Sequence, residues 1–594
     1  MPGAAAPEEA LPPAPRPGRR REPRSTLRTA ARLALPAVLL AVLSGCGAVP
    51  DGEREGDESQ GFVSAAGRGL VVDGEPTRLR AVNFTNRYDA ETRITDLLSS
   101  AHPSARDYAQ VEDMGFNSVR FVLRGEWLAQ DEEAFWTWLD RNVAWAREAG
   151  VRLVLDLHVP VGGRWLDPGS AATTFEMWSD PAVRARTVEF WREVASRYHD
   201  EPSVAAYDLL NEPVTTDSDG EQWRSLAQEL VDTIRAVDDN HLLVVGGVYG
   251  VEGRFDPEGQ ERHFLVDDEN VMYDFHFYEP YPYTHQYAPW VDPARDGGTY
   301  PDPDRLVATA PPEVSEADVV ATSSLPEGTS GWTRYDSGVV TVEDPSAVAA
   351  LPQFVVEGGM DGTARVDGVT VTEYGPDGTV LREVLDDPMD RSSTGSWYGW
   401  GDDDGADPSV RLEREPSGRQ DDGSLSVGGS VRSGAGWNNS QHLFRVVPGN
   451  RYRVQGYMRG DDVVLTDGDR SRVRLELEVY TEVPGAPGGG FLARDKDYLE
   501  HAMSRHLRFG AEHGVPMSVM EFGAVRQTFE MPGKGGDRWV GDVLGLLAEH
   551  DLSFGYWEYH DPDMGIFVDE GGAPDEPNEA LLDVLRRELH EESP

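Results

Sequence analysis

The sequence predicts an α/β protein: a (β/α)8 barrel of the TIM type, interrupted after its sixth strand by an all-β, jelly-roll-like insert. Three observations lead to this fold. Short apolar runs alternate with helical patterns over 62–295, the region 296–487 has only β-type runs and turns, and the alternation resumes over 488–594. Alternating strands and helices are typical of parallel βα units, and eight such strands close a barrel.

The first part of the barrel, 62–295, is expected to supply six strands. They are predicted at Leu79–Phe84, Asn117–Leu123, Val151–His158, Val204–Asn211, His241–Gly247 and Val271–Tyr278. Asp131–Ala149 has apolar residues at three-to-four spacing, which predicts a helix capped at Asp131. A second helix is expected to begin at Asp180-Pro181, because proline is favoured in the first helical turn. A third helix is predicted over Gln222–Val237.

The last part, 488–594, is expected to complete the barrel. Strands are predicted at Val515–Glu521 and Leu552–Tyr559. Helices are predicted at Ala493–His513, Asp537–His550 and Asn578–Leu589. Six strands before the insert and two after it make eight, which is the strand number of this barrel.

Function in such barrels lies at the carboxyl ends of the strands. The predicted strands end in residues suited to sugar chemistry, namely Arg120, His158, Asn211, Glu212, His276, Tyr278, Glu521 and Trp557. Two of these residues carry carboxyl groups. Glu212 follows the fourth strand, and Glu521 ends the seventh. Glycoside hydrolysis needs such a pair, one group to protonate the leaving oxygen and one to attack or to activate water.

The strand ends resemble glycoside hydrolase family 5, the cellulase-type family of clan A. The resemblance is carried by Asn211-Glu212-Pro213, His276-Phe277-Tyr278 and Glu521-Phe522-Gly523. It implies that Glu212 is the general acid/base and Glu521 the nucleophile of a retaining mechanism.

The same resemblance implies roles for the neighbouring residues. Arg120 and Tyr278 would hydrogen-bond Glu521, and Asn211 would bind the sugar 2-hydroxyl. His158 and His276 would line the reacting subsite, and Trp557 would stack on a pyranose ring. Structural alternatives stay open: an ion pair for Arg120, a core histidine for His158 and simple packing for Trp557.

The function expected is that of a retaining endo-β-1,4-glucanase acting on β-glucan. Alternatives are a β-mannanase, a β-1,3-glucanase, a glycoconjugate hydrolase, or a glycan-binding lipoprotein without activity. No cofactor is required by this chemistry. The histidines follow different strands with no partner at metal-ligand spacing, so no metal site is predicted.

The insert, 296–487, resembles a carbohydrate-binding module. Leu443–Met458 and Asp462–Tyr480 look like the middle of such a jelly roll. The segments that look like its end come earlier, at Trp332–Tyr335, Val339–Val342 and Gly362–Val371. One circularly permuted jelly roll and two small β units in tandem both fit. Trp397, Tyr398, Trp400 and Trp437 are candidates for sugar stacking or for the core. The turn 402–405 could hold a structural Ca²⁺, but no complete ligand set is visible.

Charge and the amino terminus predict where the protein works. The formal net charge is −51, which argues against nucleic-acid binding. Seven arginines in 16–32 precede the apolar run Leu33–Val42, which ends in Leu43-Ser44-Gly45-Cys46. This segment, 1–46, resembles a lipoprotein signal peptide with Cys46 as the lipidated residue. The acidic stretch 47–61 is expected to be a flexible linker, and the protein is expected on the extracellular side of a bacterial membrane, or secreted if the anchor is not used.

Overall fold

The computed structural model describes residues 61–87, 91–162, 176–255, 262–291, 296–315, 317–391, 393–401, 409–420, 422–568 and 576–591. The predicted signal peptide, Cys46 and nearly all of the predicted linker lie outside these ranges, as does the acidic turn 402–405. Within them, none of the helices is long and apolar enough to cross a bilayer.

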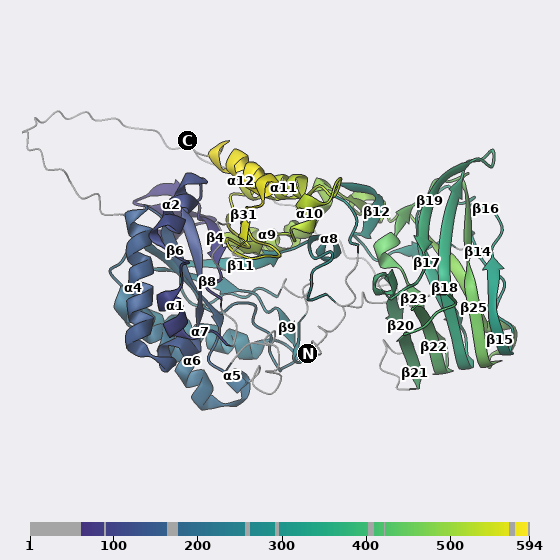
Figure 1. Ribbon diagram of the computed structural model, residues 1–594, viewed down its shortest axis with the longest axis horizontal. Helices are drawn as coiled ribbons and strands as arrows, with labels where there is room; N and C mark the ends of the chain where they lie inside the picture. Colours follow the sequence, from purple (N-terminus) through teal and green to yellow (C-terminus); the bar gives the residue numbers. More distant parts are fainter. Residues whose placement is uncertain are drawn as a thin grey trace, which may run out of the picture.

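A closed barrel of eight parallel strands forms one half of the molecule (Figure 1). In chain order the strands are β4 (Arg80–Phe84), β5 (Ser118–Arg124), β6 (Arg152–Val159), β7 (Val204–Asp208), β8 (Leu242–Gly246), β11 (Val271–Phe277), β28 (Met517–Phe522) and β29 (Ser553–Tyr556). β29 pairs with β4 and closes the ring. The predicted barrel and its interruption after the sixth strand, between β11 and β28, are confirmed.

Helices cover the outside of the barrel. They are α1 (Ile94–Ser99), α2 (Ala105–Asp113), α3 (Gly125–Gln130), α4 (Glu132–Glu148), α5 (Glu176–Ser179), α6 (Pro181–Tyr198), α7 (Glu221–Arg235), α8 (Tyr281–Thr284), α9 (Lys496–His513), α10 (Gln527–Glu530), α11 (Gly536–Glu549) and α12 (Glu579–Glu591). Asp131 caps α4 through the Ala134 amide, and Asp180 caps α6 ahead of Pro181, as the sequence pattern predicts. The helix predicted from Ala493 begins later, because residues 491–494 form a strand and Asp495 is the N-cap.

The amino-terminal end of the barrel is closed by a small sheet that the sequence analysis did not predict. It consists of β1 (Val63–Ala66), β2 (Gly69–Val72) and β3 (Glu75–Thr77). Val63 and Leu70 pack against barrel residues that include Val154 and Met520. Water is thereby excluded from this end of the barrel interior, and the opposite end, where the strands finish, carries the polar side chains.

The insert between β11 and β28 consists of two antiparallel β-sheets, seen apart from the barrel in Figure 1. One contains β12 (Asp302–Ala308), β13 (Glu313–Val314), β14 (Val320–Ala321), β17 (Ala347–Glu357), β20 (Tyr398–Trp400), β23 (Gly434–Asn438), β24 (Phe444–Arg445), β26 (Arg472–Thr481) and β27 (Phe491–Arg494). The other contains β15 (Gly328–Asp336), β16 (Val340–Thr341), β18 (Met360–Tyr374), β19 (Val380–Asp387), β21 (Val410–Glu415), β22 (Ser424–Val431) and β25 (Arg451–Leu465). Trp397 and Trp437 are buried in the core of the insert, so they belong to packing and not to a sugar-stacking surface.

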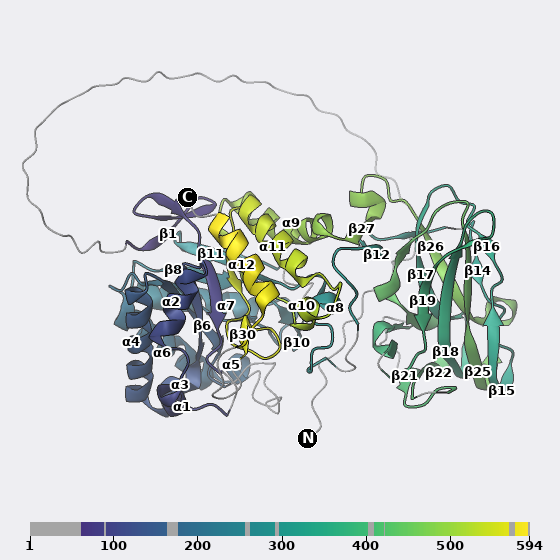
Figure 2. The same cartoon turned by 45° about the horizontal axis from the view of Figure 1, so that its top comes forward.

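The two ends of the insert lie side by side. β12 and β27 pair antiparallel, with Ala308 opposite Phe491 and Asp302 opposite Arg494. Figure 2 shows this strand pair at the junction between the barrel and the sheets. Because the insert leaves and rejoins the barrel at neighbouring positions, it interrupts the chain without interrupting the closed barrel.

Candidate active site

Glu212 follows the fourth barrel strand, and its backbone is held by neighbouring segments. The Asn211 amide donates to the Leu157 carbonyl at 3.2 Å, and the Tyr249 amide donates to the Pro213 carbonyl at 2.9 Å. Glu212 has φ of 40°, a left-handed conformation that few residues other than glycine adopt. Such backbone strain is often found at functional sites, where surrounding contacts stabilise it.

Glu521 ends the seventh strand directly opposite His276 of the sixth strand. The motif continues with Gly523, where a Cβ atom would lie 2.3 Å from the Trp557 carbonyl oxygen. Only glycine permits this close approach. The Glu-Phe-Gly sequence therefore fits the place where the ends of the seventh and eighth strands meet.

The two glutamates lie close together across the barrel mouth. One carboxylate oxygen of Glu212 and one of Glu521 are within 4.8 Å of each other and of a His276 ring nitrogen. His276 Nδ1 is 3.0 Å from Glu212 Oε1 and 3.4 Å from Glu521 Oε2. The structure thus brings together three of the residues singled out from the strand ends.

Arg120 organises the interior beneath this pair. Its fully buried guanidinium donates from Nη1 to Glu521 Oε1 at 2.8 Å and from Nε to Asp208 Oδ2 at 2.8 Å. Nη2 lies 3.1 Å from Asp156 Oδ2 and donates to Asn211 Oδ1 at 2.9 Å. The guanidinium thereby positions Glu521 and Asn211 from below with charge-assisted hydrogen bonds.

Burial and charge give these groups different protonation states. Burial alone would lower the pKa of Arg120, but the surrounding carboxylates of Asp156, Asp208, Glu521 and Asp274 raise it, so the guanidinium stays charged. Burial, followed by the charges of Glu521 and Glu212, raises the pKa of the Tyr278 phenol. Tyr278 therefore keeps its proton, and its hydroxyl donates a hydrogen bond to Glu521 Oε2 at 2.9 Å.

His276 is neutral at ordinary pH. Burial lowers the pKa of its imidazole to about 4, with the Glu521 charge acting in the opposite direction. Nε2 lies 3.4 Å from Asp274 Oδ2. Burial, and then the charge of Asp208, raises the pKa of the Asp274 carboxyl. A neutral ring carries a single N–H, so only one of its two nitrogens donates and the other accepts.

His158, Asn211 and Trp557 lie together beside the carboxylate pair. His158 Nδ1 is 2.8 Å from Asp156 Oδ2, and its Nε2 is 3.4 Å from the Asn211 amide nitrogen. The His158 ring stacks on Trp557 with centroids 5.3 Å apart and planes 19° from parallel. All eight residues predicted from the strand ends are thus near the carboxyl end of the barrel, and their individual roles remain predictions.

Three buried carboxyl groups of the site were not foreseen. Asp156 and Asp274 each lie two residues before a site histidine, and Asp208 ends the fourth strand. Because side chains alternate along a strand, residues i and i+2 point to the same face. The pattern Asp-x-His at 156–158 and 274–276 was therefore a readable signal for inward-facing pairs.

Metal-ligand geometry occurs at two places in the described part of the chain. One is the group Glu212, His276 and Glu521. Residues from different strands converge here where the barrel closes, and the prediction that the site histidines bind no metal stays a prediction. The second group, His102, Asp107 and His560, lies outside the eight predicted residues.

Comparison with known proteins finds similarity over the first part of the barrel. Residues 73–310 match the family model described as Cellulase (glycosyl hydrolase family 5). Over 195 residues the chain is 33% identical to Endoglucanase C of Acetivibrio thermocellus, covering 32% of this chain and 54% of that protein. Over 291 residues it is 25% identical to mannan endo-1,4-beta-mannosidase 1 of Oryza sativa subsp. japonica, and the match covers 43% of this chain and 65% of that protein. The chain thus spans about half the length of Endoglucanase C.

Among solved structures, Cel5A of Thermotoga maritima in complex with cellobiose is similar, with 14% identity and a TM-score of 0.43, covering 85% of this chain and 96% of that chain. The family match ends before Glu521 and Trp557, which the closed barrel brings next to the matched residues. The stretch 73–310 of this chain is thus similar to the model of glycosyl hydrolase family 5.

Proposed function

We propose that the protein is a retaining glycoside hydrolase that cleaves β-glycosidic bonds, with Glu521 as nucleophile and Glu212 as acid/base. The observation that carries this proposal is the separation of the two carboxyl groups, whose nearest oxygens lie within 4.8 Å. Retaining enzymes hold their carboxyl groups about 5–5.5 Å apart, whereas inverting enzymes leave about 6.5–9.5 Å for a water molecule.

In the first step, a Glu521 oxygen forms a bond to the anomeric carbon as the bond to the leaving oxygen breaks. The Glu212 carboxylic acid transfers its proton to that oxygen, and the leaving sugar departs as an alcohol. In the second step, Glu212, now a carboxylate, takes a proton from water, whose oxygen displaces Glu521. The two inversions at the anomeric carbon leave its configuration retained.

The surrounding residues support these two roles. Arg120 and Tyr278 donate to different oxygens of Glu521, which stabilises an ionised and oriented nucleophile. Neutral His276 adds no positive charge next to Glu212, which suits a carboxyl group that must hold a proton before the first step. Asn211, oriented by Arg120, presents its amide nitrogen on the side of His158, where we propose that it binds a sugar hydroxyl.

For the substrate we propose a β-1,4-glucan cleaved internally, because the relative with 33% identity is an endoglucanase. A β-1,4-mannan is the second candidate, because the mannan endo-1,4-beta-mannosidase matches over a longer segment. A partly exposed Trp557 beside the catalytic pair suits stacking against either pyranose. β-1,3-Glucan is tested alongside them.

We further propose that the protein is exported and anchored by lipid on Cys46, on the strength of the arginine-rich, apolar and Leu-Ser-Gly-Cys segments of 16–46. Metabolic labelling with a fatty acid tests this in the full chain. Label in the wild type and none in Cys46→Ala supports the anchor. Equal label in both contradicts it.

The catalytic proposal is tested by reducing-end release from carboxymethyl cellulose, barley β-glucan, mannan and laminarin, with Glu521→Ala as the blank. Release from the β-1,4-glucans that exceeds the blank supports the endoglucanase, and release from mannan alone supports the second candidate. NMR of the first product distinguishes the mechanism, because a retaining enzyme initially forms the β-anomer. Glycan binding without turnover, unaffected by Glu521→Ala, would instead support a binding protein.

A further inference from the structure

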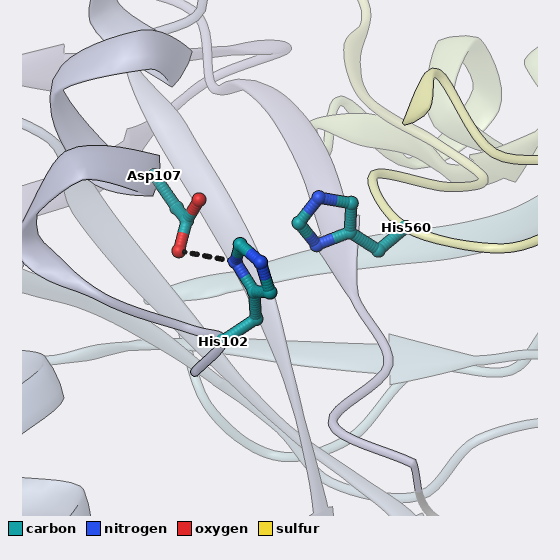
Figure 3. A group of neighbouring side chains, drawn as sticks. All are labelled: His102, Asp107 and His560. Atoms are coloured by element: carbon teal, nitrogen blue, oxygen red, sulfur yellow. Dashed lines mark hydrogen bonds and ion pairs between the residues drawn. The ribbon is translucent and has the colours of Figure 1, made fainter. Parts of the chain in front are cut away.

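We propose that His102, Asp107 and His560 form a binding site for a divalent transition-metal ion, with Zn²⁺ as the best match. Figure 3 shows the three side chains, two from the segment that precedes and begins α2 and one from the segment that follows β29. Each offers one ligand atom, and the three atoms lie within 4.8 Å of one another. This site is separate from the carboxylate pair and does not depend on the proposed function.

The distances suit a small metal ion. His102 Nδ1 is 3.0 Å from Asp107 Oδ2. At Zn–N and Zn–O bond lengths of about 2.0–2.2 Å, tetrahedral ligand atoms lie about 3.3–3.6 Å apart, so these two atoms need to separate by only about 0.3–0.6 Å. The His560 ring lies against the His102 ring, with centroids 4.3 Å apart and planes at 69°. Figure 3 shows the His560 ring facing the His102–Asp107 pair, and one of its ring nitrogens lies within 4.8 Å of the ligand atoms of both.

The charge of Asp107 is the second observation that points to a cation. Its side chain is 2% exposed, and its one ion-pair partner among the described residues is the His102 ring. The other contacts of the carboxylate are hydrogen bonds from the backbone and hydroxyl of Ser104 and from the Tyr559 hydroxyl. By contrast, the buried carboxylates Asp156 and Asp208 both contact the guanidinium of Arg120. A buried carboxylate requires a compensating charge, which a divalent ion supplies here.

The chemistry of the ligands selects the class of metal. Two imidazoles and one carboxylate suit Zn²⁺ and its neighbours Co²⁺ and Ni²⁺, whereas Mg²⁺ and Ca²⁺ prefer sets of oxygen ligands. Ser104 holds Asp107 at 2.7 Å from its amide and 2.8 Å from its hydroxyl, and such outer contacts orient a metal ligand. The side chain of His102 is 27% exposed, which gives an ion access from solvent.

A metal at this position would join the start of α2 and the segment before it to the segment that follows β29. His102 and Asp107 follow the first strand, β4, and His560 follows the eighth, β29, and these strands are neighbours in the barrel. The ion would therefore fasten the closing point of the barrel, where its first and last strands meet. Its expected effect is on stability.

The test is isothermal titration of the purified, tag-free protein with ZnCl₂ at pH 7.5, together with thermal unfolding with and without Zn²⁺. We expect one site that is lost in His102→Ala and in His560→Ala. Its affinity should fall more than about 100-fold in each, because changing even an outer contact costs about 10–100-fold. His560→Gln, which keeps a polar side chain, should lose the site as well while remaining folded.

Two matched controls separate this site from others. His199→Ala removes an exposed histidine that lies 3.0 Å from Asp200, and it should keep full Zn²⁺ affinity. Glu521→Ala disrupts the other group with ligand geometry, and it should also keep the site. The proposal is overturned if the wild type binds no Zn²⁺ at micromolar concentrations, if His560→Ala binds as tightly as the wild type, or if the site disappears in Glu521→Ala.

Discussion

Arg120 and Glu521, which are 401 residues apart in the chain, meet inside the barrel with 2.8 Å between Nη1 and Oε1. The insert separates them in sequence, yet in the closed barrel only β29 and β4 stand between the strands that carry them. The guanidinium fixes one oxygen of Glu521, and Tyr278 fixes the other. The nucleophilic role proposed for Glu521 therefore depends on a geometry that only the complete barrel provides.

The first prediction concerns the nucleophile. Glu521→Ala should lower kcat/KM on the responsive polysaccharide by about 10³-fold or more, because losing a covalent nucleophile removes the main route to the product. Added azide should restore turnover of an activated aryl glycoside by occupying the space of the carboxylate. Glu549→Ala, at an exposed glutamate paired with Lys496, is the control. Near-normal activity of Glu521→Ala would rule out its role.

The second prediction separates the acid from the nucleophile. Glu212→Gln should lower activity on the polysaccharide by about 10²–10⁴-fold, because the leaving oxygen then departs unprotonated. An aryl glycoside with an activated leaving group needs no proton, so its glycosylation should be affected far less. Stopped-flow measurement of aryl release tests this. Equal losses on both substrates would contradict the acid role of Glu212.

The third prediction concerns the buried charge network. Arg120→Met leaves Asp156, Asp208 and Glu521 without their shared guanidinium, and breaking a buried ion pair in this way costs about 3–5 kcal/mol. Urea unfolding should show this loss of stability in addition to a loss of activity. The control is Arg197→Met, which breaks an exposed pair with Asp140 and should cost at most about 1 kcal/mol. Similar losses in the two variants would show that burial does not govern the effect.

The barrel could be predicted from the sequence because its strands are buried on both faces and read as apolar runs. The strand predicted over Val151–His158, for example, is observed over Arg152–Val159. The β1–β3 sheet escaped prediction because its strands have only three or four residues and carry little pattern. Residues 493 and 494 were assigned to the following helix, because the strand pairing of β27 with β12 depends on a segment almost 190 residues away.

The site was predictable where motifs mark the strand ends and unpredictable where contacts cross the barrel. Glu212 and Glu521 stand in recognisable tripeptides, so their positions could be read directly. Asp208 carries no such mark, and its pairing with Arg120 follows from closure of the barrel. The His102–Asp107–His560 group is a similar case, since it exists only because the first and eighth strands are neighbours.

The fourth prediction concerns acid stability. His263 Nε2 lies 3.2 Å from His506 Nδ1. Burial lowers the pKa of His263 to about 4, and burial followed by the charge of His263 lowers the pKa of His506 well below its usual range. In the unfolded chain both have a pKa of about 6.5. Below that pH the unfolded state binds protons that the folded state does not, so stability falls as the pH drops from about 6.5 toward 4.

Each buried histidine contributes a slope of up to about 1.4 kcal/mol per pH unit in this range. The double variant His263→Phe/His506→Phe removes both groups, and a phenyl ring at 506 keeps the stacking on Phe275, whose ring is 4.1 Å away. Urea unfolding at pH 7 and pH 5 should show a smaller difference for this variant than for the wild type. The exposed-site variant His199→Gln should leave the difference unchanged. An unaltered slope in the double variant would contradict the prediction.

The fifth prediction concerns the independence of the barrel from the insert. Ala308 and Phe491 are opposite each other in the β12–β27 pair, so a two-residue Asn-Gly turn can connect them in place of 309–490. Leu306 and Phe491 pack against the insert and are changed to threonine, which suits an exposed strand. The shortened protein should fold and keep kcat/KM on a soluble polysaccharide within about tenfold, or about 1.4 kcal/mol. A barrel that unfolds or loses all activity would show instead that the insert is part of its structure. The strand pair alone would then be insufficient to hold the sixth and seventh strands in register.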